Sequence, residues 1–264
     1  MIIDCHHHLG EEPDYVEKLV QECKRLKIDK VCLMGLPDFE GFSTNSQIKE
    51  AIKRYPDFLI GFAFADLRTI IPDDINRFKE KKFSGLKFIY PPANYDTEKF
   101  DRVYQRAEEL EMPALFHLGI VARNELLNPY RISSNYMKPI YLDTLARIFP
   151  KLNIIGAHLG NPWYEEATMA ARWNPNLYFD LSGSTLKKKT PEFLGNLLWW
   201  TPQTRYRDPE GRYAWEKILF GSDVPYNEIE EVMADYKRIL NKLKISQEIQ
   251  DKMFGGTMAK ILKL

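Results

Sequence analysis

The sequence predicts an α/β fold, a single barrel of eight parallel strands and surrounding helices that spans residues 1–264. Short apolar runs of strand character recur along the chain, and amphipathic helical patterns lie between them. The length of 264 residues is typical of one such barrel. Together the alternation and the length favour a (β/α)8 barrel of the TIM type.

The eight apolar runs follow one another at intervals of about 24 to 40 residues, roughly what a strand, a helix and two loops require. An open, doubly wound sheet is the alternative architecture, but the sequence shows no glycine-rich phosphate loop to favour it. The runs are Met1–Cys5, Val31–Gly35, Phe58–Ala65, Leu86–Tyr90, Ala114–Phe116, Leu152–Ala157, Leu177–Leu181 and Ile218–Phe220.

Helical patterns fill the intervals. In Asp14–Leu26, apolar side chains such as Leu19 and Cys23 fall on one face and charged ones on the other. Proline or a capping residue stands at several expected starts, as at Pro72. The further patterns are Lys99–Leu110, Leu142–Ile148 and Pro162–Trp173, and the additional C-terminal helices are expected at Glu228–Leu243 and Gln247–Leu264.

Composition narrows the class of partner. Lys plus Arg equals Asp plus Glu at 37 each, so no electrostatic footprint for nucleic acid or for an anionic membrane is present. Three cysteines without paired spacing, and no apolar stretch of signal or membrane-spanning length, fit a reducing interior. We therefore expect a cytoplasmic enzyme that acts on a small-molecule substrate, with no nucleic acid and no membrane partner.

Polar residues fall where the predicted strands end. His6 and His8 follow the first run, His117 and His158 end the fifth and sixth, and Asp223 follows the eighth. Because barrel enzymes carry their chemistry at the carboxyl ends of their strands, these side chains are expected to meet in one site. Histidine nitrogens and a carboxylate are suitable ligands for zinc and similar divalent ions.

Strand alternation refines the first run. With a period of two, Asp4, His6 and His8 are expected on one side, and Cys5 and His7 on the other. On this phase His6 and His8 can reach one ion. His7 is expected to pack behind the barrel against helices, with Cys5 in the core on that same side.

These motifs resemble the amidohydrolase superfamily, and within it the amidohydrolase-related ("amidohydrolase 2") branch. The similar stretches are D-x-H-x-H at residues 4–8, HLG at 117–119, AHLG at 157–160, the strand and D-L-S-G at 176–183, and LFGSDVPY at 219–226. They span almost the whole chain in order. The resemblance implies a metal-dependent barrel enzyme and leaves the substrate open.

By that resemblance, His6, His8, His117 and Asp223 would ligate one divalent ion, with zinc expected first. His158 would stand beside the ion, polarising a substrate oxygen or assisting proton transfer. A bound divalent ion lowers the pKa of its water toward about 7, and Asp223 can accept that proton and return it to a leaving group. Asp223 and His158 are therefore the expected catalytic residues.

Each of the other candidates has more than one possible role. Lys87 is carboxylated and bridges a second metal, or pairs with Asp4, or binds a substrate carboxylate. Asp180 supports a ligand or is a polar strand end. Two long segments, 119–138 and 182–215, follow the fifth and seventh runs and are either pocket walls or surface excursions. Arg123, Arg131 and Trp163 are substrate contacts or ordinary surface and packing residues.

The sequence leaves several functions open. The first is hydrolysis of a lactone, amide or ester, and the second is non-oxidative decarboxylation of an unsaturated or aromatic acid. A non-catalytic binding protein and a metal-dependent nuclease or phosphoesterase fit less well. Retention of both histidines at positions 6 and 8 favours hydrolysis. The aromatic segment near Trp199 is either a lid or a subunit interface, so a homodimer is also left open.

Overall fold

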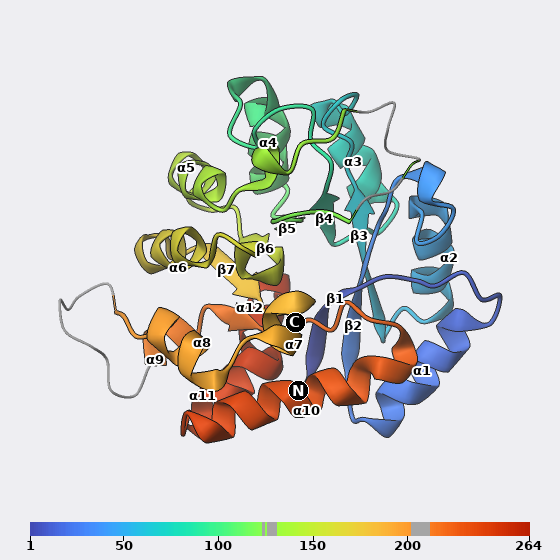
Figure 1. Cartoon of the computed structure of the whole chain (residues 1–264). Coiled ribbons are helices and arrows are strands. Elements are labelled where there is room, and N and C mark those ends of the chain that lie inside the picture. The colour runs from blue at the N-terminus through green and yellow to red at the C-terminus, as the bar shows by residue number, and fades with distance from the viewer. Residues whose placement is uncertain (123–124, 126–130, 202–211) are drawn as a thin grey trace.

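The computed structural model describes residues 1–122, 125, 131–201 and 212–264. Eight parallel strands pair in sequence order and form a nearly closed barrel with helices around it (Figure 1). The Cys5 N–H donates to the Phe220 carbonyl at 2.9 Å, and the Asp223 N–H donates to the His6 carbonyl at 2.8 Å, which joins the last strand to the first. The predicted barrel is therefore confirmed.

Each of the eight predicted runs overlaps a strand, because each offers consecutive apolar residues that are buried on both faces. The first strand begins later than predicted and includes two of the histidines. The strands are β1 (Ile3–His7), β2 (Lys30–Met34), β3 (Leu59–Phe64), β4 (Gly85–Phe88), β5 (Ala114–Phe116), β6 (Ile154–Gly156), β7 (Leu177–Asp180) and β8 (Ile218–Leu219).

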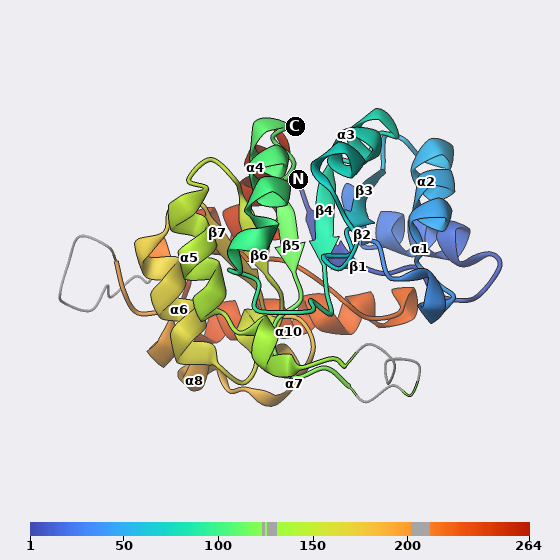
Figure 2. The same ribbon diagram turned by 90° about the horizontal axis from the view of Figure 1, so that it is seen from above.

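Helices cover the outside of the barrel (Figure 2). The helix after β2 begins with a capping box, in which the Thr44 side chain accepts from the Gln47 N–H and the Gln47 side chain accepts from the Thr44 N–H. The outer helices are α1 (Tyr15–Arg25), α2 (Asn45–Arg54), α3 (Pro72–Glu80), α4 (Asp101–Glu109), α5 (Ile140–Ile148), α6 (Tyr164–Trp173), α7 (Ser184–Lys188), α8 (Pro191–Leu197), α9 (Arg212–Trp215) and α10 (Ile229–Lys242).

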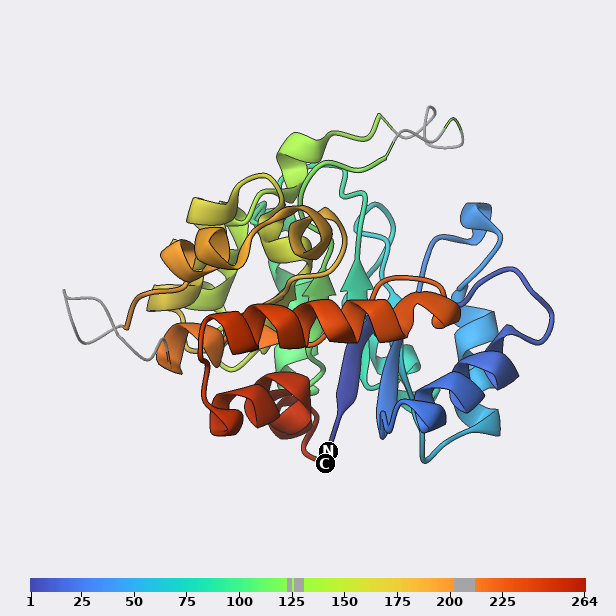
Figure 3. The ribbon, with the colours of Figure 1, turned by 60° about the horizontal axis from the view of Figure 1, so that its bottom comes forward.

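The C-terminal segment closes one end of the barrel. It is built from α11 (Gln247–Asp251), a π-helical turn and α12 (Thr257–Leu262) where one continuous closing helix was expected. Met258 and Ile261 of α12 pack into the interior cluster with Ile3 and Cys5. The two termini lie side by side at this end (Figure 3). The carboxyl ends of the strands are therefore left to form the site.

The first strand departs from strict alternation. Asp4 pairs with Val31 and His7 with Leu33, so β1 takes three steps where β2 takes two, which is a β-bulge. Cys5 lies in the barrel interior, whereas Asp4 and His7 lie on the outer side. The prediction that Asp4 shares a side with His6 and His8, and Cys5 with His7, is wrong because the extra residue shifts the phase between Asp4 and His7.

Among the described residues, no helix is long and apolar enough to cross a membrane.

Candidate metal centre

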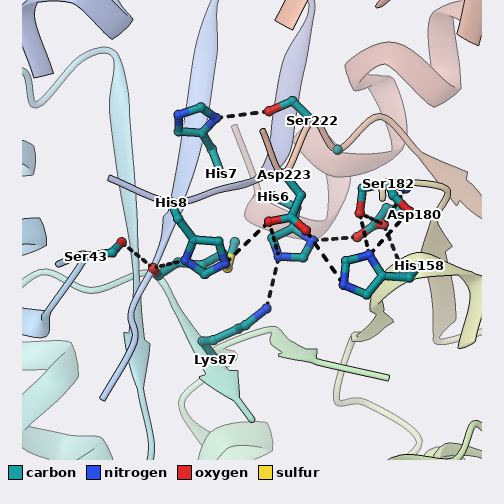
Figure 4. A network of polar contacts seen from close by, with 12 residues as sticks. His6, His7, His8, Ser43, Lys87, His158, Asp180, Ser182, Ser222 and Asp223 are labelled. Atoms are coloured by element: carbon teal, nitrogen blue, oxygen red, sulfur yellow. Dashed lines mark hydrogen bonds and ion pairs between the residues drawn. The ribbon is translucent and has the colours of Figure 1, made fainter. Parts of the chain in front are cut away.

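Three of the predicted side chains meet at the carboxyl ends of the first and last strands. One ligand atom each from His6, His8 and Asp223 lies within 4.8 Å of the others. The Nε2 atoms of His6 and His8 are 3.6 and 3.7 Å from Asp223 Oδ1 (Figure 4). Asp223 takes a left-handed backbone with φ 47°, and its N–H donates to the His6 carbonyl. This hydrogen bond ties the carboxylate to β1.

A fourth predicted side chain faces the same carboxylate. His158 Nε2 lies 3.7 Å from Oδ2, the other oxygen of Asp223. His158 follows β6 with φ 60°, and its N–H donates to Asp180 Oδ1 at 2.9 Å. Its ring centroid is 5.5 Å from that of His6. The two oxygens of Asp223 thus face different histidines.

The other ring nitrogen of each histidine is held by a partner outside the centre. His6 Nδ1 is 2.9 Å from Asp180 Oδ2, and His8 Nδ1 is 2.9 Å from the Met34 carbonyl. His158 Nδ1 is 2.9 Å from Ser182 Oγ, which itself donates to Asp180 Oδ1. Since these partners accept, each Nδ1 carries the proton and each Nε2 presents a lone pair to the centre.

Burial keeps the centre poor in protons. Burial lowers the pKa of His8, and the charges of Lys87 and His6 lower it further. Burial likewise lowers the pKa of His158, against the opposing effect of Asp223 and Asp180. For Asp180, burial alone would raise the pKa, but His6 and its other hydrogen-bond partners outweigh it and hold the pKa well below its usual range. Neutral imidazoles beside carboxylates are the state that a metal requires.

His117 lies next to this group but outside the cluster of three. Its ring centroid is 5.0 Å from that of His158, and its buried Nε2 has no hydrogen-bond partner. Burial lowers its pKa, followed by the charges of His158 and Lys87. Gly119 brings this loop against the next one, because a Cβ there would lie 2.0 Å from the Asn161 carbonyl oxygen. The tight approach sets His117 beside His158.

Lys87 comes from β4 and is almost fully buried. Its Nζ lies 3.0 Å from His6 Nε2, so it does not pair with Asp4, one of the roles considered for it. Burial lowers its pKa to about 8, although the charges of Asp223 and Asp180 oppose the shift. A buried amine of this kind can donate to a substrate oxygen or carboxylate.

The donor set fits a divalent ion. Nitrogen and carboxylate oxygen suit zinc first. The outward hydrogen bonds of His6 and His8 are the arrangement that orients metal-binding imidazoles. The unpartnered buried Nε2 of His117 is the further observation that a ligand group belongs here, since buried polar atoms ordinarily have partners.

Behind the centre, the outward-facing residues of the bulge form a second polar network. Ser222 Oγ donates to Asp4 Oδ2 at 2.5 Å and lies 3.0 Å from His7 Nδ1, while His7 Nε2 is 3.1 Å from the Tyr15 hydroxyl. Burial raises the pKa of Asp4 to about 6, against the hydrogen bonds from Ser222. His7 therefore packs behind the barrel against α1, and points away from the other histidines (Figure 4).

The remaining candidates make other contacts, are exposed, or lie outside the described residues. Trp163 is half-buried before α6, with the Lys138 amine 5.3 Å from its ring centroid. Arg131 is exposed, and Arg123 lies outside the described residues. Sequence reasoning missed Ser182, which holds His158 Nδ1, and Ser43, which donates to the Met34 carbonyl that also contacts His8 Nδ1. Ser182 stands in the D-L-S-G stretch, which was a signal, but Ser43 has none.

Comparison with known proteins places the chain in a family. The family model described as "Amidohydrolase" matches residues 38–264, a range that includes His117, His158 and Asp223 and begins beyond His6 and His8. No curated protein matches by sequence. Many solved structures share the fold.

Three of these structures illustrate the range. A probable 2-pyrone-4,6-dicarboxylic acid hydrolase from Acinetobacter baumannii has a TM-score of 0.69 at 16% identity, covering 100% of this chain and 99% of that one. An amidohydrolase from Burkholderia multivorans with bound zinc has a TM-score of 0.68 at 16% identity, covering 100% of this chain and 99% of that one. A 5-carboxyvanillate decarboxylase from Novosphingobium aromaticivorans with bound manganese has a TM-score of 0.60 at 16% identity, covering 93% of this chain and 80% of that one. On the strength of the family match, the chain belongs to the amidohydrolase family.

Proposed function

We propose that this chain is a metal-dependent hydrolase that uses water to cleave a small-molecule lactone, amide or ester. The observation that carries the proposal is the convergence of three imidazole Nε2 atoms on one carboxylate. His6 and His8 approach one oxygen of Asp223 and His158 approaches the other, at 3.6 to 3.7 Å. A carboxylate surrounded by imidazole nitrogens is suited to moving protons on and off water.

His6, His8, His117 and Asp223 would hold one divalent ion, most suitably zinc. When bound, the ion would lower the pKa of water toward about 7 and polarise a substrate carbonyl. Related folds with bound zinc and with bound manganese support a divalent ion without choosing between them. Asp180 keeps His6 in the tautomer whose Nε2 lone pair faces the centre.

Asp223 and His158 would share the proton transfers. Asp223 accepts the proton of the attacking water at Oδ2, the oxygen that faces His158 Nε2. His158, whose Nδ1–H is held by Ser182, can take that proton at Nε2. In the protonated form, Nε2 donates to the substrate oxygen that becomes negative, or to the leaving group. Once the proton has passed to the leaving group, His158 is neutral and Asp223 is ionised again, as at the start.

Decarboxylation is the second candidate, and Lys87 is the observation that favours it. Its buried amine beside His6 could hold a substrate carboxylate. A solved decarboxylase also shares the fold, as does a probable hydrolase of a pyrone dicarboxylate. Retention of both His6 and His8 favours hydrolysis of the two.

One experiment separates these readings. The purified protein is loaded with zinc, its metal content per chain is measured, and it is assayed against lactones and unsaturated acids in 18O-labelled water. Hydrolysis places 18O in the product carboxylate, whereas decarboxylation releases carbon dioxide. About one metal per chain is expected, and nearly two would point to a carboxylated Lys87.

The matched variants are Asp223→Asn at the centre and Asp73→Asn on the exposed face of α3. The amide that replaces the Asp223 carboxylate cannot accept a proton, so turnover should fall by at least about 100-fold, while the Asp73 variant should match the wild type. Equal turnover by the two variants would contradict the proposed role of Asp223.

A further inference from the structure

An apolar pocket opens beside the metal centre. Its volume is about 310 Å³, and His8 and Asp223 are among the residues that line it. Its walls come from three segments, which follow β1, β2 and β8. A cavity of about 300 Å³ is at the lower end of the size that small-molecule sites use. A group bound here would therefore lie directly against the reacting centre.

The walls of the pocket are formed mainly by apolar side chains. Leu36, Phe42, Val224 and Pro225 line the pocket, and among its described lining residues there is no lysine or arginine. Tyr15 also lines it, but its hydroxyl is engaged by His7 Nε2 and the Tyr226 N–H. A carboxylate placed here would lose its water without gaining a partner.

The apolar surface continues across the mouth of the barrel. Leu36 and Phe42 also pack with Ile89 and Tyr90, which follow β4. The Tyr90 hydroxyl donates to Glu40 at 3.2 Å, and Glu40 raises the pKa of Tyr90 after the larger effect of burial. The apolar wall therefore extends beyond the pocket, and the Tyr90 hydroxyl that borders it is already engaged by Glu40.

We propose that this pocket binds an uncharged apolar substituent of the substrate, such as a short alkyl chain or an aryl ring, carried next to the scissile carbonyl. The inference rests on the proposed hydrolysis at the metal centre and names the substrate class. The class is an alkyl- or aryl-substituted lactone or ester, and not a substrate with carboxylates on both sides of the reacting bond.

The test uses the zinc-loaded enzyme and a series of γ-lactones that carry an alkyl chain on the carbon next to the carbonyl. The chain grows by one methylene from one member of the series to the next. Burial of each methylene should raise kcat/KM by about fourfold until the pocket is filled, after which the values level off. Phe42→Ala should move that limit to longer chains, and Leu36→Phe should move it to shorter ones. Phe78→Ala on α3, a half-buried phenylalanine away from the lining, is the matched control.

A second readout does not depend on turnover. The affinities of 2-alkylcyclopentanones, which cannot be hydrolysed, are measured by calorimetry on the same protein and variants. If affinity rises with chain length but no lactone is turned over, the proposed role of the pocket stands and the proposed hydrolase activity is wrong. If turnover is independent of chain length, or is faster for a carboxylate-bearing lactone, the proposed role of the pocket is wrong and the proposed hydrolase activity stands. Circular dichroism confirms that each variant is folded.

Discussion

His6 Nδ1 lies 2.9 Å from Asp180 Oδ2, in a contact that is buried on both sides. The same carboxylate accepts at its other oxygen from the His158 N–H and the Ser182 hydroxyl. Asp180 therefore fixes the positions of His6 and His158, the two imidazoles that lie between it and Asp223. The last residue of β7 links the first strand of the barrel to the loop after the sixth.

Replacing Asp180 by Asn tests this link. If the amide oxygen keeps the bonds to Ser182 and His158, the amide N–H₂ faces His6 Nδ1, which must then accept. The proton moves to Nε2, and the lone pair needed for a metal is lost. We expect zinc affinity to fall by about 10- to 100-fold in chelator competition. The exposed Asp73→Asn variant should not change it, and unchanged affinity in Asp180→Asn would remove the orienting role.

His117 and His158 are predicted to have different roles, His117 as a metal ligand and His158 as a proton-transfer group. Removal of a ligand strips the metal, whereas removal of a proton-transfer group spares the metal and slows the reaction by about 100- to 10,000-fold. We therefore expect His117→Ala to lose most of its zinc and His158→Ala to keep one equivalent with a reduced kcat. Elemental analysis and steady-state kinetics on the same preparations distinguish the two. The reverse pattern would make His158 the ligand and His117 a neighbour.

The barrel and the site region could be predicted because periodicity and strand-end position are local signals. Each apolar run became a strand, and His6, His8, His158 and Asp223 came together as their places at strand ends indicated. The phase within β1 could not be predicted, since a bulge depends on how β1 pairs with β2. That pairing moved Asp4 to the outer side and Cys5 to the interior.

Supporting residues in loops were harder to find. Ser43 donates to the Met34 carbonyl at 2.8 Å and accepts from the Leu9 N–H, next to the hydrogen bond of His8. It lies far from His8 in the sequence, in a left-handed conformation, and no periodic pattern connects the two. Contacts set by tertiary packing leave no trace in hydrophobic periodicity.

The network behind the centre predicts a stability effect. Ser222→Ala removes the hydroxyl that donates to Asp4 and contacts His7 Nδ1. The Oδ2 atom of the buried Asp4 carboxylate and the buried Nδ1–H of His7 would then lack partners, although Asp4 Oδ1 keeps its two backbone donors. The loss costs about 2 to 4 kcal/mol of unfolding free energy. Urea unfolding measures this loss. Ser133→Ala, at a position whose side chain does not cap the 3-10 turn that follows it, should stay within about 0.5 kcal/mol of the wild type, and an equally small loss in Ser222→Ala would contradict the network's importance.

Lys217 predicts a pH dependence that is separate from the metal centre. Its amine is buried against the carbonyls of Asn174 and Pro175 at 3.0 and 2.7 Å, with the Tyr178 ring centroid 4.8 Å away. Burial lowers its pKa to about 8, against the charge of Glu216. The folded state therefore loses this proton near pH 8, whereas the unfolded chain keeps it to about pH 10.4.

Because the unfolded state binds more protons in that window, the unfolding free energy should rise with pH between about 8 and 10.4. The cost of burying the charge is fully present below pH 8. The stability of the wild type relative to Lys217→Met should therefore improve by up to about 3 kcal/mol across the window, whatever its starting value. Urea unfolding at several pH values measures the difference, with Lys242→Met on an exposed position as control. A difference that stays constant with pH would mean that the Lys217 amine carries its charge in the fold at no cost.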